Sequence, residues 1–303
     1  MRSTHWLAKR FGLRLVGAAL LAAACLASCS SGGDSDAENV LRFSAIPDDN
    51  TTELKEKFGP VARYLSEKLE VPVEYVPSSD YGASVEMFKN GDIHLAWFGG
   101  LTGVQARQAI PGAHAIAQGV EDPEYYSYFI AHASTGLQRS TEFPAAIAKL
   151  KFTFGSTMST SGRLMPEHFI RKFTGKEPGE FFEHEWGFSG SHNKTAEQVN
   201  SGASQAGVLN YKVYEKMVED GKIDPEVCRV IWQTPVYPDY NFTAHPALET
   251  LFGAGFTRKL QTTLIEMNDA ELLAAFKRSG LIKAEDRDFD DILAVARSLN
   301  LAR

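Results

Sequence analysis

The sequence predicts an α/β protein of two similar lobes with a ligand cleft between them. Short apolar runs typical of strands alternate with helical patterns along the 303 residues. Shifting Tyr81–Gly100 forward by 111 residues places it on His192–Tyr211, and both segments read as polar turn, helix, glycine, strand and helix. In addition, Phe154–Pro166 reads as a strand end, a turn rich in glycine and hydroxyls, and a helix start. Loops at the carboxyl ends of strands form the sites of such sheets, so each lobe is expected to present one wall of the cleft.

The expected elements follow in order along the chain. The first part gives strands at 41–46, 73–76, 93–98, 113–118 and 126–133, and helices at 51–69, 83–90 and 101–109. Pro60 predicts a kink or restart in the first helix. A new block opens with a strand at Phe152–Gly155, and the segment after Pro246 reads as mostly helical. Lobe 1 is therefore expected to comprise residues 40–133 and 236–303, and lobe 2 residues 134–235.

The N-terminus predicts a lipoprotein signal peptide over residues 1–28. Four basic residues precede an apolar run, Leu15–Leu26, that is too short for a stable membrane span. Leu26-Ala27-Ser28-Cys29 then resembles a bacterial lipobox, which predicts lipidation of Cys29, and residues 29–39 read as a flexible polar tether. The protein is thus expected to be lipid-anchored to the cell membrane, facing the periplasm or the cell exterior. An ordinary signal peptide with an incidental cysteine is the alternative.

Charge and cysteine content argue against several classes of protein. Loss of residues 1–28 removes four basic and no acidic residues, which lowers the net charge from −7 to −11. An acidic surface argues against nucleic acid as a partner. After Cys29 the sequence contains one cysteine, Cys228, so no intrachain disulfide is expected in the mature protein. No metal is expected, since Glu183-His184-Glu185 would place neighbouring side chains on opposite faces of a strand. No cofactor is expected either.

The turn Ser159-Thr160-Ser161-Gly162 predicts a site for a tetrahedral oxyanion. A helix N-terminus presents unpaired N–H groups and the positive end of the helix dipole. Pro166 suits a first helical turn. Three hydroxyls in a row exceed the one that a helix cap needs, so each is expected to donate to an oxyanion oxygen. A helix cap with no ligand is the simpler alternative.

Several motifs together resemble the phosphonate, phosphite and phosphate solute-binding proteins of ABC importers. They are, in order, Ser79-Asp80-Tyr81, DIHLAWFG from Asp92 to Gly99, Ser159–Gly162 followed by Pro166, Ser189–His192, and Arg229–Trp232. The resemblance implies a type II periplasmic-binding-protein fold that closes on a small oxyanion and docks on a membrane permease. A monomer is expected. The segments GSTMSTSGRLMPEHFI and YPDYNF look most like a branch named for selenate binding, so selenate joins phosphonate, phosphite and phosphate as a candidate ligand.

The resemblance also implies which residues bind the ligand. They are Tyr81, Phe98, Ser159, Thr160, Ser161, His192 and Asn210. The hydroxyl residues are the oxyanion donors, and His192 is a donor from the second lobe. Tyr81 and Phe98 are the aromatic wall of the first lobe. A helix cap is the alternative role for His192, and core packing is the alternative for Tyr81.

Three residues depart from the family pattern. Gly100 stands where the family often has proline or asparagine, and Asn210 stands where some members carry an acid that reads a ligand amino group. Arg163 follows the hydroxyl turn where an aromatic or aliphatic residue is common; it is either a solvated helix residue or a counter-charge for the anion. Together these departures argue against an aminoalkyl-phosphonate ligand.

A serine enzyme is the main competing class. Ser191-His192-Asn193-Lys194 matches S-x-x-K, a motif of penicillin-interacting serine enzymes, but no K-T-G partner follows. No catalytic residue is therefore assigned, and the protein is expected not to be an enzyme. A sensory or structural lipoprotein of the same fold is the other alternative. Tyr237, Asp239 and Tyr240, where the chain returns to lobe 1, belong either to the cleft or hinge or to an ordinary loop.

Overall fold

Two β-sheets with flanking helices make up the described part of the chain. The protein is represented by a computed structural model that describes residues 39–48 and 51–302. The predicted signal peptide, the lipidated Cys29 and all but the last residue of the tether lie outside this part. The described residues belong to one compact unit. None of the described helices is long and apolar enough to cross a membrane.

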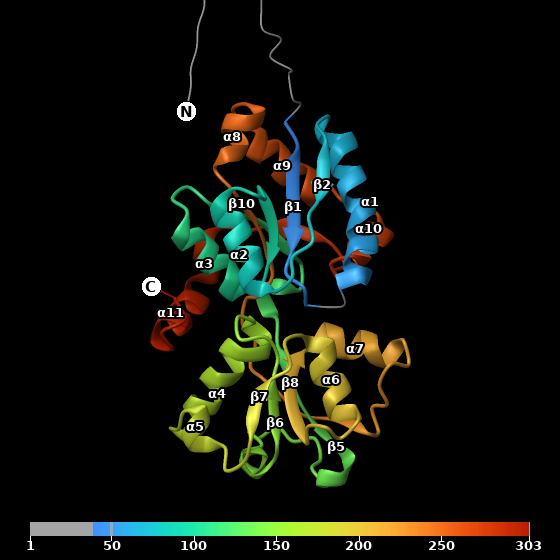
Figure 1. The fold of residues 1–303 in the computed structure, drawn as a ribbon, viewed down its shortest axis with the longest axis vertical. Helices are drawn as coiled ribbons and strands as arrows, with labels where there is room; N and C mark the ends of the chain where they lie inside the picture. Colours follow the sequence, from blue (N-terminus) through green and yellow to red (C-terminus); the bar gives the residue numbers. More distant parts are fainter. Residues whose placement is uncertain (1–38, 49–50, 303) are drawn as a thin grey trace, which may run out of the picture. The chain divides into compact units, whose positions relative to one another are not determined.

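The first sheet has the strand order β11-β4-β10-β3-β1-β2. Figure 1 labels β10, β1 and β2 of this sheet. Its strands are β1 (Leu41–Ala45), β2 (Val73–Tyr75), β3 (Leu95–Phe98), β4 (His114–Gly119), β10 (Asn241–Ala244) and β11 (Leu281–Lys283). β2, β1 and β3 are parallel, whereas β10 and β11 are antiparallel to the strands beside them. The helices of this lobe are α1 (Thr51–Leu69), α2 (Tyr81–Asn90), α3 (Gly100–Ala109), α8 (Ala247–Phe252), α9 (Phe256–Ile265), α10 (Ala270–Ala274), η5 (Asp286–Phe289) and α11 (Asp290–Ser298).

The second sheet has the order β7-β6-β8-β5-β9 (Figure 1). Its strands are β5 (Ser127–His132), β6 (Phe152–Phe154), β7 (Trp186–Phe188), β8 (Ala206–Asn210) and β9 (Cys228–Gln233). β6 is parallel to β7 and β8, and β5 is antiparallel to β8 and β9. The helical segments of this lobe are η2 (Ala133–Thr135), η3 (Ala145–Lys149), η4 (Thr160–Leu164), α4 (Met165–Thr174), α5 (Pro178–Phe181), α6 (His192–Asn200) and α7 (Tyr211–Glu219).

The two sheets share one plan, which confirms the repeat inferred from the sequence. β2-β1-β3-β10 in the first sheet corresponds to β7-β6-β8-β5 in the second, three parallel strands beside an antiparallel one. α2 and α6 begin at the matched residues Tyr81 and His192. Gly91 and Gly202 follow these helices with φ of 75° and 74°, a conformation that glycine adopts without strain. The shared plan brings corresponding helix starts to the same edge of each sheet.

Strand β5 lies in a different sheet from the one expected. The predicted boundary at residue 133 assigns Ser127–His132 to lobe 1, but this strand pairs with β8 and β9 of the second sheet. An apolar strand that is buried on both faces carries no signal for which sheet it joins. Strand pairing therefore puts the outgoing crossing before Ser127, and the other domain limits stay predictions.

Three further elements differ from the sequence expectation. α1 continues through Pro60 as one helix, so the predicted restart is wrong, and the alternative, a kink, stays a prediction. β11 is a short strand inside the C-terminal segment that reads as helical. The helix after the hydroxyl turn begins at Thr160 with one π-helical turn, η4, and continues as α4 from Met165. Such π-helical turns are frequent at functional sites.

The two segments that cross between the sheets lie side by side. Tyr125 and Tyr237 exchange backbone hydrogen bonds, each of 2.9 Å. Arg278, which follows α10, forms a buried ion pair with Asp122 in the short helix η1 (Asp122–Glu124). The crossing is therefore tied to the C-terminal part of the first lobe.

Candidate functional site

Helix starts from both lobes meet at the candidate site. The N–H of Leu101, at the start of α3, donates to Thr160 Oγ1 of the hydroxyl turn at 3.0 Å. Within the second lobe, Ser159 Oγ lies 3.4 Å from Nε2 of His192, the first residue of α6. The positive ends of three helical segments, α3, η4 and α6, therefore face one buried region.

The hydroxyl turn is tightly built. Ser159 Oγ accepts a hydrogen bond from the N–H of Gly162 at 2.9 Å and so caps η4. A side chain at Gly162 would place its Cβ 3.0 Å from Ser159 Oγ and 3.1 Å from His192 Cε1, so a larger residue there would crowd both side chains. The side chains of Ser159, Thr160 and Ser161 are all buried. One hydroxyl thus serves as the cap of the simpler alternative, and the other two make no hydrogen bond inside the turn among the described residues.

His192 is held between the hydroxyl turn and strand β8. The backbone N–H of Asn210 donates to His192 Nδ1 at 3.4 Å. Because Nδ1 accepts, we assign the proton of the neutral ring to Nε2. That proton faces Ser159 Oγ. A bound anion at this position would accept a hydrogen bond from Nε2–H.

Asn210 acts as a structural link at the edge of the site. Its Oδ1 accepts from the N–H of Val213 at 2.7 Å and caps α7. Its Nδ2 donates to the hydroxyl of Tyr240 at 3.0 Å. That hydroxyl donates in turn to Asp48 Oδ2 at 2.8 Å. The side-chain amide is thereby engaged at both of its polar atoms.

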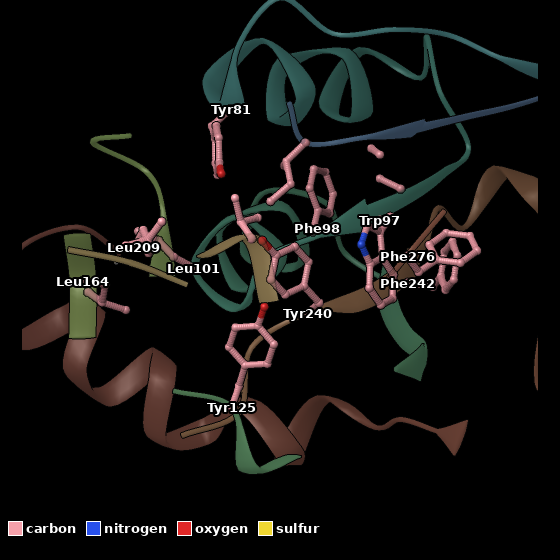
Figure 2. Close-up of a cluster of buried hydrophobic side chains, with 14 of the residues drawn as sticks. Tyr81, Trp97, Phe98, Leu101, Tyr125, Leu164, Leu209, Tyr240, Phe242 and Phe276 are labelled. Atoms are coloured by element: carbon pink, nitrogen blue, oxygen red, sulfur yellow. The ribbon is translucent and has the colours of Figure 1, made fainter. Parts of the chain in front are cut away.

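The two predicted aromatic residues have different positions. Tyr81 is buried at the start of α2 (Figure 2). A Cβ on the adjacent Gly82 would lie 3.2 Å from Met158 Sδ, so this helix start reaches the loop before the hydroxyl turn. Phe98 packs edge-on against Phe88 of α2, with ring centres 5.6 Å apart. The structure therefore brings Tyr81 to the site and gives Phe98 a place in the core of the first lobe.

Asp239 lies at the centre of this site, although the sequence leaves it between a cleft and a loop. Its side chain is 1% exposed, and its Oδ1 accepts from the N–H of Gly100 at 2.9 Å. Burial is the main cause that raises the pKa of Asp239 to about 7, and the N–H of Gly100 with the nearby hydroxyls of Thr160 and Ser161 counteracts this in part. A single acidic residue beside Pro238 gives no periodic pattern, so the sequence alone could not favour a place in the site over a place in an ordinary loop for Asp239.

Two polar atoms in this centre lack a well-formed hydrogen bond among the described residues. Asp239 Oδ2 and Ser161 Oγ are buried and make no hydrogen bond of normal geometry to any residue that the structure describes. Buried polar groups without partners are rare in native proteins, because leaving one unpaired costs about 1–3 kcal/mol. A small oxyanion would accept a hydrogen bond from the hydroxyl of Ser161. It would also bond to Asp239 Oδ2 while either the carboxyl group or the anion carries a proton.

Arg163 points its charge away from this centre. Its guanidinium pairs with Glu167, whose side chain is 2% exposed, and it lies over the rings of Phe154 and Phe188. Arg171 pairs with the other oxygen of the same carboxylate at 2.8 Å. The i,i+4 spacing of Arg163 and Glu167 on one helical face accounts for the pair.

We expect Arg163→Met to lower the free energy of unfolding by about 1.5–3 kcal/mol, since one charged partner of Glu167 is lost. Oxyanion affinity should stay within about twofold of the wild type, because Arg163 pairs elsewhere. Urea unfolding and calorimetric titration would measure the two quantities. A tenfold loss of affinity in a variant that keeps its fold would instead identify Arg163 as the counter-charge.

The residues considered for a serine enzyme or a metal site make other contacts. Ser191 Oγ donates to Asn193 Oδ1 at 2.6 Å, so its hydroxyl is engaged with an amide and not with a base. Within residues 39–48 and 51–302, no group of three His, Cys, Asp or Glu side chains is placed to hold a metal ion.

Comparisons with known proteins agree with this architecture. The chain is 38% identical to the probable ABC transporter phosphite binding protein PhnD1 of Prochlorococcus marinus (strain MIT 9301) over 271 residues, 87% of this chain and 91% of that protein. It is 27% identical to the phosphate-import protein PhnD of Mycolicibacterium smegmatis, covering 89% of this chain and 92% of that one. The solved structure of PhnD1 in complex with methylphosphonate matches with a TM-score of 0.82 over 86% of this chain and 98% of that chain.

These matches confirm the predicted type II fold of two lobes. Residues 43–289 match the family described as ABC transporter, phosphonate, periplasmic substrate-binding protein. The chain therefore belongs to the periplasmic substrate-binding proteins of phosphonate ABC transporters.

Proposed function

We propose that this protein captures a tetrahedral oxyanion between its lobes and delivers it to the membrane permease of an ABC importer without changing it chemically. The observation that carries this proposal is the pair of unsatisfied buried atoms, Ser161 Oγ and Asp239 Oδ2, among helix starts of both lobes. Helix N-termini with added hydroxyls favour an anion with several oxygens. The candidates are phosphonate, phosphite, phosphate and selenate.

Binding in this scheme proceeds by docking and closure. The oxyanion first meets the hydroxyls of Thr160 and Ser161 and the Nε2–H of His192 on the second lobe. In the structure the N–H of Leu101 from the first lobe bonds to Thr160 Oγ1, and a bound oxygen would compete for the same donor. Closure brings Tyr81 and this N–H against the ligand. The permease then recognises the closed protein, which we propose acts as a monomer held to the membrane through Cys29.

The relatives narrow the ligand candidates. One is named for phosphite and another for phosphate import, and one solved structure contains methylphosphonate. These three share a phosphorus centre with at least two charged or hydrogen-bonding oxygens. They favour phosphorus oxyanions as the ligand. Selenate remains a candidate because it has a similar tetrahedral shape.

A thermal-shift screen tests this function. Phosphate, phosphite, methylphosphonate, 2-aminoethylphosphonate, sulfate and selenate would each be added to the purified protein. A ligand at about 100 times its Kd should stabilise the folded state by about 2.7 kcal/mol. No shift with any of the six would overturn the proposal, and a pull-down of the permease with the ligand-bound form would separate a transporter from a sensor.

Asp239 predicts how binding depends on pH. Its pKa of about 7 means that the carboxyl ionises as the pH rises through neutrality, which puts a negative charge beside the bound anion. Asp239→Asn keeps an acceptor for Gly100 and removes that charge. We therefore expect the variant to bind more tightly than the wild type above pH 8 by about tenfold, and equally at pH 5.5.

The ratio of the two affinities, measured by calorimetry at each pH, cancels the titration of the ligand itself. Unfolding gives a second readout. The folded state holds the Asp239 proton up to about pH 7, whereas an unfolded aspartate releases it near 4. Stability from this group is thus lost as the pH rises from about 4 to 7. Weaker binding by the variant at high pH would contradict the repulsion and show that the carboxylate accepts from a protonated ligand.

A further inference from the structure

The hydroxyl of Tyr240 joins the two lobes beside the site. Its oxygen accepts from Asn210 Nδ2, at the end of β8 in the second lobe, at 3.0 Å. Its proton is donated to Asp48 Oδ2, just after β1 in the first lobe, at 2.8 Å. Donor and acceptor are thus both used, and the chain of bonds links the second lobe to the first.

The ring of Tyr240 is held rigidly behind this hydroxyl. It stacks on Trp97 with ring centres 5.5 Å apart and an interplanar angle of 24°. Tyr125 packs against it with ring centres 5.5 Å apart (Figure 2). The guanidinium of Arg278 lies 4.8 Å from the centre of the Tyr240 ring. A ring packed and stacked on several sides has no room to turn away from a ligand.

This ring lies next to the oxyanion site. Asp239 directly precedes it, and Asn210, its hydrogen-bond partner, also donates its backbone N–H to His192 Nδ1. In Figure 2 the hydroxyl ends of Tyr81 and Tyr240 point toward each other. Under the proposed function, the donors of the second lobe would hold the oxygens of a tetrahedral anion, which would leave its remaining substituent facing these tyrosines.

We propose that Tyr240 is a specificity-determining residue that limits the ligand to an oxyanion whose fourth substituent is no larger than a methyl group. This inference rests on the proposed function. A longer substituent would have to displace a packed ring and break both of its hydrogen bonds. A cationic substituent would find a neutral amide at Asn210 in place of a carboxylate, and its Oδ1 already accepts one hydrogen bond from the N–H of Val213.

Calorimetric titration with a graded series tests the inference. Methyl-, ethyl- and propylphosphonate differ by one methylene each, and 2-aminoethylphosphonate adds a charge. For the wild type, we expect affinity to fall about tenfold or more with each methylene beyond methyl, and the amino compound to bind no better than ethylphosphonate. Tyr240→Ala should reduce the preference for methyl over propyl at least about tenfold, because it opens the wall.

Two further variants keep the test conclusive if Tyr240→Ala does not fold, and separate the effect of the ring from that of its hydroxyl. Tyr240→Leu replaces Tyr240→Ala if the latter does not fold, and the same loss of preference is expected. Tyr240→Phe keeps the ring but loses both hydrogen bonds, so it should keep the preference and bind every ligand about tenfold more weakly. The matched control is Tyr64→Phe, which removes one hydrogen bond to Thr263 O between α1 and α9 and should change neither quantity.

The outcomes separate the two proposals. An unchanged preference in Tyr240→Ala or Tyr240→Leu, with methylphosphonate still bound, overturns the role of Tyr240 and leaves the proposed function standing. A wild type that binds propylphosphonate as tightly as methylphosphonate does the same. A wild type that binds none of these ligands and no inorganic oxyanion overturns the proposed function, and the inference with it.

Discussion

Replacing Arg278 by methionine is expected to lower the free energy of unfolding by about 3–5 kcal/mol, because it leaves the Asp122 carboxylate buried without its counter-charge. The two side chains are 2% and 0% exposed. Arg278 donates to both carboxylate oxygens, at 2.6 and 2.8 Å, and to the carbonyl of Phe276 at 2.8 Å. The guanidinium also lies within 5.6 Å of the ring centres of Trp97, Tyr125 and Tyr240.

Urea unfolding of a double-mutant cycle measures this effect. Asp122→Asn combined with Arg278→Met removes both charges and keeps an acceptor for the N–H of Gly119, so it should recover a large part of the loss. Arg287→Met is the matched control, since its side chain is 77% exposed and its pair with Glu285 lies at the surface. It should change stability by no more than about 0.5 kcal/mol. Equal effects of Arg278→Met and Arg287→Met on the free energy of unfolding would contradict a stabilising role for the buried Arg278–Asp122 ion pair.

Ser161→Ala is expected to weaken oxyanion binding about tenfold to a hundredfold, the loss of one hydrogen bond to a charged group. In the absence of ligand the same change should leave stability unchanged or raise it. The reason is that Ser161 Oγ is buried without a hydrogen bond of normal geometry among the described residues. Removing an unsatisfied hydroxyl relieves its desolvation cost.

A ligand-binding role for Ser161 predicts that Ser161→Ala loses affinity without losing stability, so both quantities are measured. Calorimetry gives the affinity, and urea unfolding without ligand gives the stability. Ser204→Ala is a matched control, because this buried serine donates to Gln198 Oε1 at 3.2 Å away from the hydroxyl turn. It should lose a little stability and no affinity. A Ser161→Ala protein that binds normally would remove Ser161 from the site.

The fold was predictable where the chain repeats itself. The matched helix starts at Tyr81 and His192 and the glycines that follow both helices are visible as a periodic pattern. The sheet that β5 joins was not, since pairing between distant strands leaves no mark in a short apolar run. The π-helical turn at Thr160 was also missed, because it depends on tertiary contacts around the hydroxyl turn.

The site was predictable in part, for similar reasons. Hydroxyls next to a helix start and a histidine at the next helix start indicate an anion site locally, and the structure brings these residues together. Asp239 reaches the centre only through the path of the crossing segment, which no local pattern encodes. The pairing of Arg163 with Glu167 was readable from their i,i+4 spacing. The use of Asn210 as cap and link needed the position of Tyr240.

Calorimetric titration of the purified protein with phosphite, methylphosphonate and phosphate tests the central claim most directly. We predict saturable binding of at least one of them at a single site, and a clear loss of that binding in Ser161→Ala. Absence of saturable binding for all three, in a protein that is folded by its unfolding transition, would contradict it.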